Sequence, residues 1–168
     1  MPAPLTVLIP TLNAADSLGP TLASMFDGVQ DGLIAELIFA DGGSTDGTAA
    51  IADDIGATLI TSAPGRGTQL ATAAKTLKTP WLMVIHADTV LSQDWTRPVR
   101  DHINTSQNAA YFRLAFDSTK PAARRTAAWA NLRSKLFKLP YGDQGLLLPT
   151  ALYKNVGGYA DIPLMEDV

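Results

Sequence analysis

The feature that most constrains the fold of this chain is an alternation of short apolar runs with segments that have helical spacing. Four runs have the length of β-strands and are bounded by Pro, Gly or Asp: residues 5–10, 37–40, 58–61 and 81–85. The three segments between them predict helices. One carries Leu18, Leu22 and Met25–Phe26 on one face, and the others cover residues 48–55 and 68–77. This alternation favours an α/β fold, with a mostly parallel sheet, helices on both faces and right-handed crossovers.

The second half of the chain has a less regular pattern. It predicts, in order, a helix, a strand, a long helix, a second strand and one helical turn: residues 93–104, 110–116, 121–139, 144–148 and 152–156. The last turn is closed by Gly157 and Gly158. Within the long helix, four apolar residues share one side, which we expect to pack against the protein: Ala122, Trp129, Leu132 and Leu136.

Size and composition limit the class of protein. A chain of 168 residues with 46% apolar and 17% charged residues fits one globular domain over residues 1–168. The absence of cysteine excludes disulfides, thiolate catalysis and cysteine-ligated metals, and it fits a cytoplasmic protein. The N-terminus lacks the pattern of a signal peptide, and no segment approaches the ~20 apolar residues that span a bilayer. We therefore expect a soluble protein, or one peripheral to a membrane.

Charge is distributed unevenly along the chain. Six of the 13 basic residues and none of the 16 acidic residues lie between Lys120 and Lys138, although the whole chain has a net charge of −3. A single basic stretch in an acidic protein argues against a general nucleic-acid-binding function. The simplest interpretation of this stretch is a solvated helix face. The alternative is contact with an anionic acceptor or with a membrane surface.

Polar, loop-forming sequences follow all four predicted strands of the first half. They are P-T-L-N (10–13), D-G-G-S-T-D-G-T (41–48), S-A-P-G-R-G-T-Q (62–69) and H-A-D-T (86–89). Ligands of α/β proteins bind at the carboxyl ends of the parallel strands, so these sequences predict one crevice. Its candidate polar side chains are Asn13, Asp41, Ser44, Asp46, Arg66, His86 and Asp88.

Two of these sequences suggest chemistry, and each also has an ordinary structural explanation. Asp41 can accept hydrogen bonds from a base or ribose, and Gly42 lets a ligand approach the backbone. A simple turn in which Ser44 or Asp46 caps the next helix explains the same residues. One carboxylate such as Asp88, together with a diphosphate, is a typical set of ligands for Mg²⁺ or Mn²⁺. The alternative makes Asp88 a turn residue and His86 a core histidine.

The sequence around Arg66 resembles part of a dinucleotide-binding fingerprint. Gly65 and Gly67 have the required spacing, but Leu70 occupies the third glycine position, and the sequence follows the third strand instead of the first. A Rossmann-type dinucleotide site is therefore disfavoured. Arg66 is then either a contact for phosphate or sugar oxygens, or an exposed side chain.

Taken in order, these motifs resemble those of the family-two glycosyltransferases, which have the GT-A fold. L-I-P-T-L-N resembles the first-strand motif, F-A-D-G-G-S-T-D-G-T the nucleotide-binding motif, and H-A-D-T the D-x-D metal motif. The late G-G-Y…P-L-M-E-D-V segment resembles the glycine–aromatic segment that runs into an E-D motif. The resemblance covers essentially the whole chain. H-A-D, Y-G-D-Q and M-E-D-V together are most similar to a small bacterial subgroup often associated with arsenosugar synthesis.

The resemblance implies inverting, metal-dependent transfer of a sugar from a nucleoside diphospho-sugar, most commonly a UDP-sugar, to an acceptor hydroxyl. Residues 1–90 would bind the donor and residues 91–168 would form the acceptor side, with Asp143 and Gln144. The implied donor-binding residues are Pro10, Thr11, Asn13, Asp41, Gly42, Ser44, Arg66, His86 and Asp88. Asp88 would also bind Mn²⁺ or Mg²⁺, while His86 replaces the first Asp of D-x-D. Asp167 would be the catalytic base, and Glu166 would help to position the acceptor.

The chain ends one residue after Asp167, where the proteins that it resembles continue into a helix and a C-terminal segment. The resemblance therefore implies a truncated chain with impaired activity, and exposed apolar surface that favours a homo-oligomer. Two other interpretations stay open: a non-catalytic module that binds nucleotide-sugars or assists assembly, and a nucleotidyltransferase. The second predicts a glycine-rich, basic loop after the first strand, and P-T-L-N-A-A-D contains neither glycine nor a basic residue.

Overall fold

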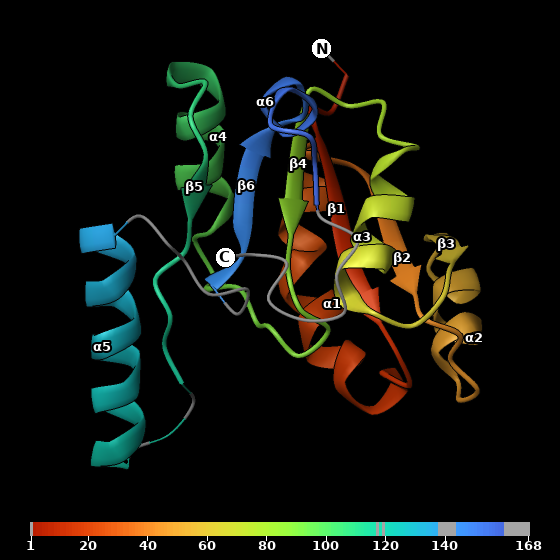
Figure 1. Ribbon diagram of the computed structural model, residues 1–168, viewed down its shortest axis with the longest axis horizontal. Coiled ribbons are helices and arrows are strands. Elements are labelled where there is room, and N and C mark those ends of the chain that lie inside the picture. Colours follow the sequence, from red (N-terminus) through yellow and green to blue (C-terminus); the bar gives the residue numbers. More distant parts are fainter. Residues whose placement is uncertain (1, 117, 119, 138–143, 160–168) are drawn as a thin grey trace.

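Six strands form one mixed sheet at the centre of the molecule (Figure 1). The computed structural model describes residues 2–116, 118, 120–137 and 144–159. The strands are β1 (Leu5–Thr11), β2 (Ile34–Asp41), β3 (Thr58–Thr61), β4 (Trp81–Val84), β5 (Ala110–Tyr111) and β6 (Leu146–Pro149). Their order across the sheet is β3-β2-β1-β4-β6-β5. The first four strands run parallel, while β6 is antiparallel to β4 and to β5.

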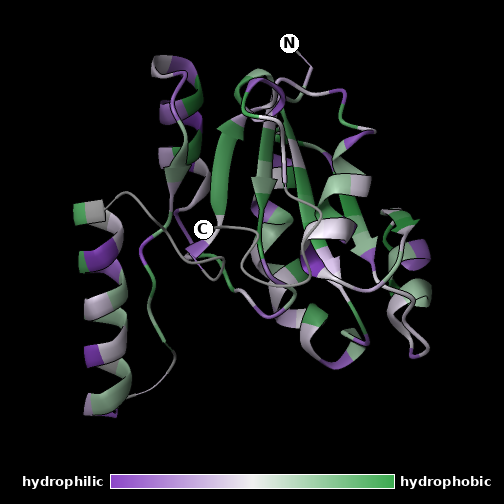
Figure 2. Cartoon of the chain, in the orientation of Figure 1, coloured by the Kyte–Doolittle hydropathy of each residue, from purple (hydrophilic) through white to green (hydrophobic). Residues whose placement is uncertain are grey.

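Helices cover both faces of the sheet, as the alternation of strands and helices predicted. They are α1 (Ala15–Gln30), α2 (Thr48–Asp54), α3 (Arg66–Ala74), α4 (Thr96–Thr105), α5 (Pro121–Phe137) and α6 (Thr150–Asn155). Helices α1, α2 and α4 pack on the face that carries Val7, Ile9 and Phe39. Helices α3 and α6 pack on the other face, against Leu8 and Ile38. The strands β1, β4 and β6 are apolar along their length, which fits a sheet buried on both sides (Figure 2).

The predicted strand over residues 110–116 is much shorter in the structure, where β5 covers only Ala110–Tyr111. The cause lies in the hydrogen bonds of Leu114. Its N–H donates to Oδ1 of Asn131, and its carbonyl accepts from Nδ2 of the same side chain, both at 2.9 Å. One side chain of α5 thus takes both backbone groups, which would otherwise continue the ladder at this sheet edge.

The prediction for the long helix was right about its start at Pro121 and wrong about its packing, while residues 138 and 139 lie outside the described residues. Helix α5 lies beyond β5, at the end of the sheet opposite β3 (Figure 1). The side chains of α5 that the structure describes as buried are small, and they are Ala127, Ala130 and Ser134. The side expected to pack is exposed instead: Trp129 by 66%, Leu132 by 46% and Leu136 by 65%, with Ala122 exposed as well.

The inner side of α5 is held by polar groups, which explains why the large apolar residues point outward. Ser134 donates from Oγ to Oε1 of Gln144, and Asn131 binds the backbone of Leu114. Small residues on this side let the helix approach closely enough for those bonds. Among the described residues, no helix is long and apolar enough to cross a membrane.

Candidate functional site

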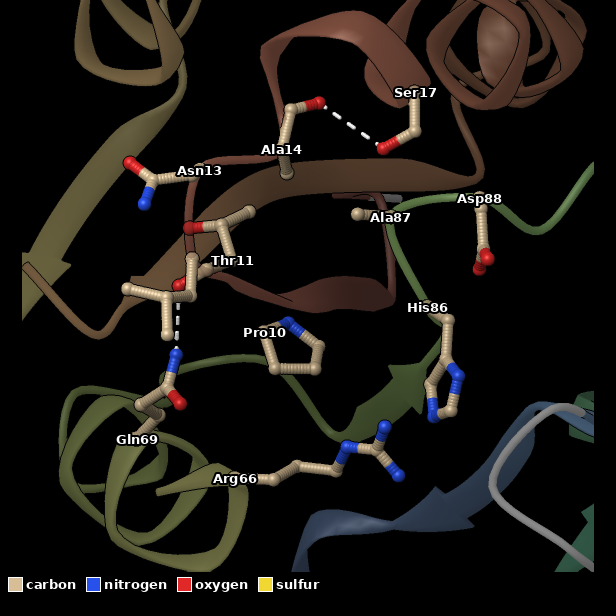
Figure 3. A pocket seen from close by; sticks show the side chains of 11 residues that line it. Pro10, Thr11, Asn13, Ala14, Ser17, Arg66, Gln69, His86, Ala87 and Asp88 are labelled. Carbon is tan, nitrogen blue, oxygen red and sulfur yellow. Dashed lines mark hydrogen bonds between the residues drawn. The ribbon is translucent and has the colours of Figure 1, made fainter. Parts of the chain in front are cut away.

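A polar cavity of about 350 Å³ opens at the carboxyl ends of β1 and β4, in the size range of small-molecule sites (Figure 3). This is the point where the order of the strands reverses. The chain moves from β1 to β2 and β3 on one side, and then returns to place β4 on the other side of β1. Such a reversal leaves a crevice between the loops that follow the two strands. The lining residues are Pro10, Thr11, Leu12, Asn13, Ala14, Ser17, Arg66, Gln69, His86, Ala87 and Asp88.

Six of the nine donor-binding residues expected from the sequence line this cavity, and they are Pro10, Thr11, Asn13, Arg66, His86 and Asp88. Three others, Asp41, Gly42 and Ser44, lie beside it at the end of β2. Asp143, Glu166 and Asp167 lie outside the described residues. Gln144 is described and is buried.

The carboxylate of Asp41 is buried and accepts four hydrogen bonds. The N–H groups of Gly43 and Ser44 donate to Oδ2, each at 2.8 Å. The hydroxyls of Thr11 and Ser44 donate to Oδ1. Four bonds match the usual acceptor capacity of a carboxylate. Asp41 therefore organises the loop after β2 and joins it to the end of β1.

Hydrogen bonds set the ionisation of Asp41. Burial by itself raises the pKa of this carboxyl, because it disfavours the charged form. The bonds donated by the side chain and N–H of Ser44, the N–H of Gly43 and the hydroxyl of Thr11 outweigh burial and hold the pKa below its usual value. Asp41 is therefore a carboxylate at neutral pH and an unsuitable general acid.

Asn13 joins the loop after β1 to the loop after β2. Its backbone has a positive φ of 51°, a conformation that asparagine tolerates better than most residues. In this conformation its N–H donates to Oγ of Ser44, and its Oδ1 accepts from the N–H of Thr45, both at 2.8 Å. Asp46 makes a parallel link by accepting from the N–H of Ala15. The two loops thus form one rigid wall beside the cavity.

Gln69 is a site residue to which the sequence analysis assigned no role. It lies on the buried face of α3, and its Nε2 donates to the carbonyls of Thr11 (2.8 Å) and Ala40 (2.7 Å). Its Oε1 accepts from the N–H of Gly65. A Cβ at Gly42 would lie 3.2 Å from this side chain, so Gly42 also provides room for Gln69. A glutamine at an apolar-face position of α3 is the signal that identifies it.

Arg66 and His86 extend toward the same side of the cavity, from the start of α3 and from the end of β4 (Figure 3). Asp88 lies further along the loop after β4, where it lines the same cavity. A cation and an imidazole at one end of a polar cavity suit the charge of a phosphate group.

A divalent cation fits this site only in the company of a phosphate ligand. Among the described residues, no three His, Asp or Glu side chains gather as a metal site. Asp88 is the single carboxylate among the described residues that line the cavity. Mg²⁺ and Mn²⁺ accept one carboxylate when substrate phosphates and waters supply the remaining oxygens. The donor set therefore matches a cation that binds together with a nucleotide.

Gln144, which the sequence assigned to the acceptor side, connects α5 to β5. Its Nε2 donates to the carbonyl of Phe112 at 3.2 Å and to Oδ1 of Asn131 at 3.3 Å, and its Oε1 accepts from Ser134. The N–H of Phe112 donates in turn to the carbonyl of Gln144. This residue fixes the segment that leads into β6.

The fold and the cavity together define an α/β protein with a ligand site of the nucleotide-binding kind, at the switch point of a mostly parallel sheet. Comparison with known proteins specifies the family. Residues 6–154 match the model of glycosyl transferase family 2, and the chain belongs to that family.

Proteins of known sequence and structure agree with this assignment. Over 92 residues, which are 52% of this chain and 29% of the relative, the chain is 33% identical to glycosyltransferase AglJ of Haloferax volcanii. Its fold resembles that of TarS 1-349 from S. aureus, with a TM-score of 0.70 and 16% identity over 98% of this chain and 52% of that chain. It also resembles the mannosyltransferase PcManGT of Pyrobaculum calidifontis, solved with GDP-Man and Mn²⁺, with a TM-score of 0.69 and 20% identity over 95% and 48%.

A third similar structure is glucosyl-3-phosphoglycerate synthase of Mycobacterium tuberculosis, solved with Mn²⁺, UDP and glucosyl-3-phosphoglycerate. Its TM-score is 0.63, with 20% identity over 89% of this chain and 58% of that chain. At these identities the comparison establishes the GT-A-like fold alone. The chain spans 29% of AglJ and about half of these solved chains.

Proposed function

We propose that this chain transfers a sugar from a nucleoside diphospho-sugar to an acceptor hydroxyl, with inversion at the anomeric carbon. The observation that carries the proposal is the polar cavity between β1 and β4, in a chain of glycosyl transferase family 2. Similar structures support a nucleotide donor, since they hold UDP, UDP-GlcNAc or GDP-Man. We take a UDP-sugar as the donor here.

In this proposal, the rigid wall formed by the loops after β1 and β2 receives the nucleoside. Thr11 and Asn13 face the base and ribose, and Asp41 holds their loops in place through the bonds described above. Arg66 and His86 receive the diphosphate at the far end of the cavity. The negative charge of the diphosphate favours that end over the nucleoside wall, where the Asp41 carboxylate lies.

Asp88 is the proposed ligand of Mn²⁺ or Mg²⁺, with the donor phosphates as its partners. When bound, such a cation neutralises the charge that grows on the departing diphosphate. His86 occupies the first acidic position of the D-x-D pattern. We assign it to a phosphate or ribose oxygen and leave Asp88 as the carboxylate that contacts the cation.

The proposed chemistry is a single displacement. The acceptor oxygen forms a bond to the anomeric carbon as the bond from that carbon to the diphosphate oxygen breaks on the opposite face. Asp167 takes the proton of the acceptor hydroxyl, and Glu166 positions the acceptor. Asp143 is proposed on the acceptor side, next to Gln144. Since no covalent sugar–protein intermediate forms, one displacement inverts the configuration.

Three finer assignments belong to the same proposal. The motifs H-A-D, Y-G-D-Q and M-E-D-V support membership of the bacterial subgroup often associated with arsenosugar synthesis. The absence of cysteine supports a cytoplasmic location. The exposed apolar side of α5 supports self-association, which should be measured together with activity.

Calorimetric titration of the chain with UDP and GDP, with and without Mn²⁺, tests the donor site. We expect Mn²⁺-dependent binding with a preference for UDP. Asp88→Ala should abolish the Mn²⁺ dependence because it removes the carboxylate that lines the cavity. Asp94→Ala, an exposed acid outside the cavity, serves as the control. Unchanged Mn²⁺-dependent affinity in the Asp88 variant would remove this residue from the metal site.

Asp167→Asn tests the catalytic base, in a chain that continues past Val168. Loss of a general base should lower turnover by about 10²–10⁴-fold while nucleotide affinity stays the same. Asp94→Asn is again the control. Wild-type turnover in the Asp167→Asn variant would contradict the assignment of Asp167 as the catalytic base. If the extended chain with Asp167 intact binds nucleotide but transfers no sugar, a non-catalytic binding module is favoured instead.

A further inference from the structure

Helix α5 is amphipathic, but its large apolar side chains face solvent, whereas those of an ordinary surface helix face the core. Trp129, Leu132 and Leu136 follow one another at intervals of three and four residues, so they form one stripe, and all three are exposed. We call this stripe, with Ala122 and Arg125, the α5 outer face. Among the described side chains of α5, the buried ones are small: Ala127, Ala130 and Ser134. Large apolar side chains in water on an ordered helix point to a partner.

The orientation of α5 is fixed by bonds on its inner side. Asn131 binds the backbone of Leu114 twice at 2.9 Å, and Ser134 donates to the buried Gln144. Turning the helix to bury Trp129 would break these bonds, so they favour the observed orientation of the helix. The hydrogen bonds on the inner side therefore keep the α5 outer face directed toward solvent.

The charge of this region complements an anionic surface. All charged residues from Lys120 to Lys138 are basic, within a protein whose net charge is −3. Arg125 is exposed and lies four residues before Trp129, so the outer face itself carries a cation. Hydrophilic and hydrophobic residues are interleaved along the whole of α5, whereas the central strands β4 and β6 are mainly apolar (Figure 2).

We propose that the α5 outer face binds the surface of an anionic lipid bilayer, with the helix lying in the plane of the interface. Leu132 and Leu136 enter the boundary of the acyl chains, and the ring of Trp129 lies at the level of the headgroups. Arg125 and its basic neighbours meet the lipid phosphates. The donor cavity lies between β1 and β4, so a membrane at α5, beyond β5, leaves it accessible (Figure 1).

A lipid surface fits this face better than a second copy of the chain does. Two α5 outer faces related by a two-fold axis would offer each other apolar side chains and a cation, with no acidic residue on either face to pair with Arg125. Three large apolar side chains also provide far less than the ~800 Å² per partner that a stable protein interface buries. Bilayer binding sums apolar insertion and charge attraction over a short helix, and needs no such area.

The test is co-sedimentation of the chain with vesicles of phosphatidylglycerol and phosphatidylcholine in equal parts, and with vesicles of phosphatidylcholine alone. We expect binding to the anionic vesicles only, weakening as salt rises. Replacing Trp129, Leu132 and Leu136 by Ala together should lower affinity about tenfold or more, and Arg125→Glu should lower it less. The control is Phe26→Ala with Val29→Ala, which removes two exposed apolar residues of α1.

Tryptophan fluorescence gives a second readout that does not depend on sedimentation. The chain has three tryptophans, and Trp81 and Trp95 are buried, so a blue shift on adding anionic vesicles reports Trp129. Trp129→Phe should remove the shift while keeping the binding. Sedimentation equal to that of the wild type in the triple variant, or no binding to anionic vesicles, overturns the proposal. Light scattering that finds a dimer dispersed by the triple variant also overturns it, in favour of a second copy of the chain.

Discussion

At the scale of single residues, the donor site depends on side chains that hold backbone in place. Asp41 and Gln69 are both buried, and each is hydrogen-bonded to more than one loop. Asp41 supplies acceptors to N–H and hydroxyl groups, while Gln69 supplies donors to two carbonyls. Together they fix the ends of β1 and β2 before any ligand arrives, so the site is preorganised.

Gln69→Leu should destabilise the protein and weaken nucleotide binding. It leaves the carbonyls of Thr11 and Ala40 without the amide that satisfies them, which we expect to lower the free energy of unfolding by about 1–3 kcal/mol. Urea unfolding and UDP titration measure the two effects. Gln93→Leu makes the same chemical change at an exposed position and is the control. Equal stability of the two variants would contradict the role of Gln69.

Asp41 should make the stability of the protein sensitive to acid. Its folded pKa is lowered, so its contribution to stability is present above the unfolded pKa of about 3.9 and is lost as the pH falls through the lower folded value. Asp41→Asn should lower the free energy of unfolding at pH 7 by about 1–3 kcal/mol.

The variant should also lose less stability than the wild type on acidification below about pH 4, because it lacks this carboxylate. Urea unfolding across a pH series measures both effects, with Asp94→Asn as the exposed control. An identical pH dependence in Asp41→Asn and the wild type would contradict the assignment.

At the scale of elements, α1 is held against the chain before α4 by one tight contact. A Cβ at Gly28 would lie 2.4 Å from the ring of Trp95, whose Nε1 donates to the carbonyl of Ser24 at 2.9 Å. Glycine here serves close packing, since its φ is not in the left-handed region. The same helix contains Gly19, where an added Cβ would meet no atom within 4 Å apart from its chain neighbours. Gly19 directly precedes Pro20, whose ring disfavours the helical conformation for a residue that carries a Cβ.

Gly28→Ala and Gly19→Ala therefore should have different effects, although both add one methyl group to α1. Overpacking against Trp95 should lower the free energy of unfolding by about 1–3 kcal/mol. At Gly19 the change should be smaller, because the higher helix propensity of alanine and the contact of its Cβ with the ring of Pro20 act in opposite directions. Thermal and urea unfolding of the two variants measure the difference. A stabilising Gly28→Ala would show that the helix shifts to accommodate the methyl group.

At the scale of the whole molecule, the sequence predicted what depends on local pattern and missed what depends on long-range pairing. Strand β3 was predicted at its observed bounds, because residues that favour turns lie close to both ends of this short run and mark where the strand begins and ends. Strand β2 begins at Ile34, three residues before the prediction, since pairing with Leu5 extends it. The direction of β6 depends on its partner β4 and has no signature in its own residues.

The same distinction applies to the candidate site. Asn13, Arg66, His86 and Asp88 were predicted because they follow strands, where ligands bind in this class of fold, and Thr11 was predicted from the family resemblance; all five line the cavity. The role of Gln69 depends on a buried face of α3 that only the packed structure defines. The exposure of Trp129 was missed for a related reason, because helical periodicity finds an apolar stripe without specifying which side faces the protein.

The reversal of direction at β6 has a consequence for how the two halves of the site come together. Because β6 is antiparallel to β4, its first residue, Leu146, pairs with Val84, at the very edge where the donor cavity opens. The segment entering β6 is thereby delivered to the donor edge by a connection of about sixty residues, whereas β1 to β4 are joined by shorter crossovers. Closing the longer connection costs more chain entropy, so we expect β1 to β4 to pair first and β6 to add beside β4 afterwards.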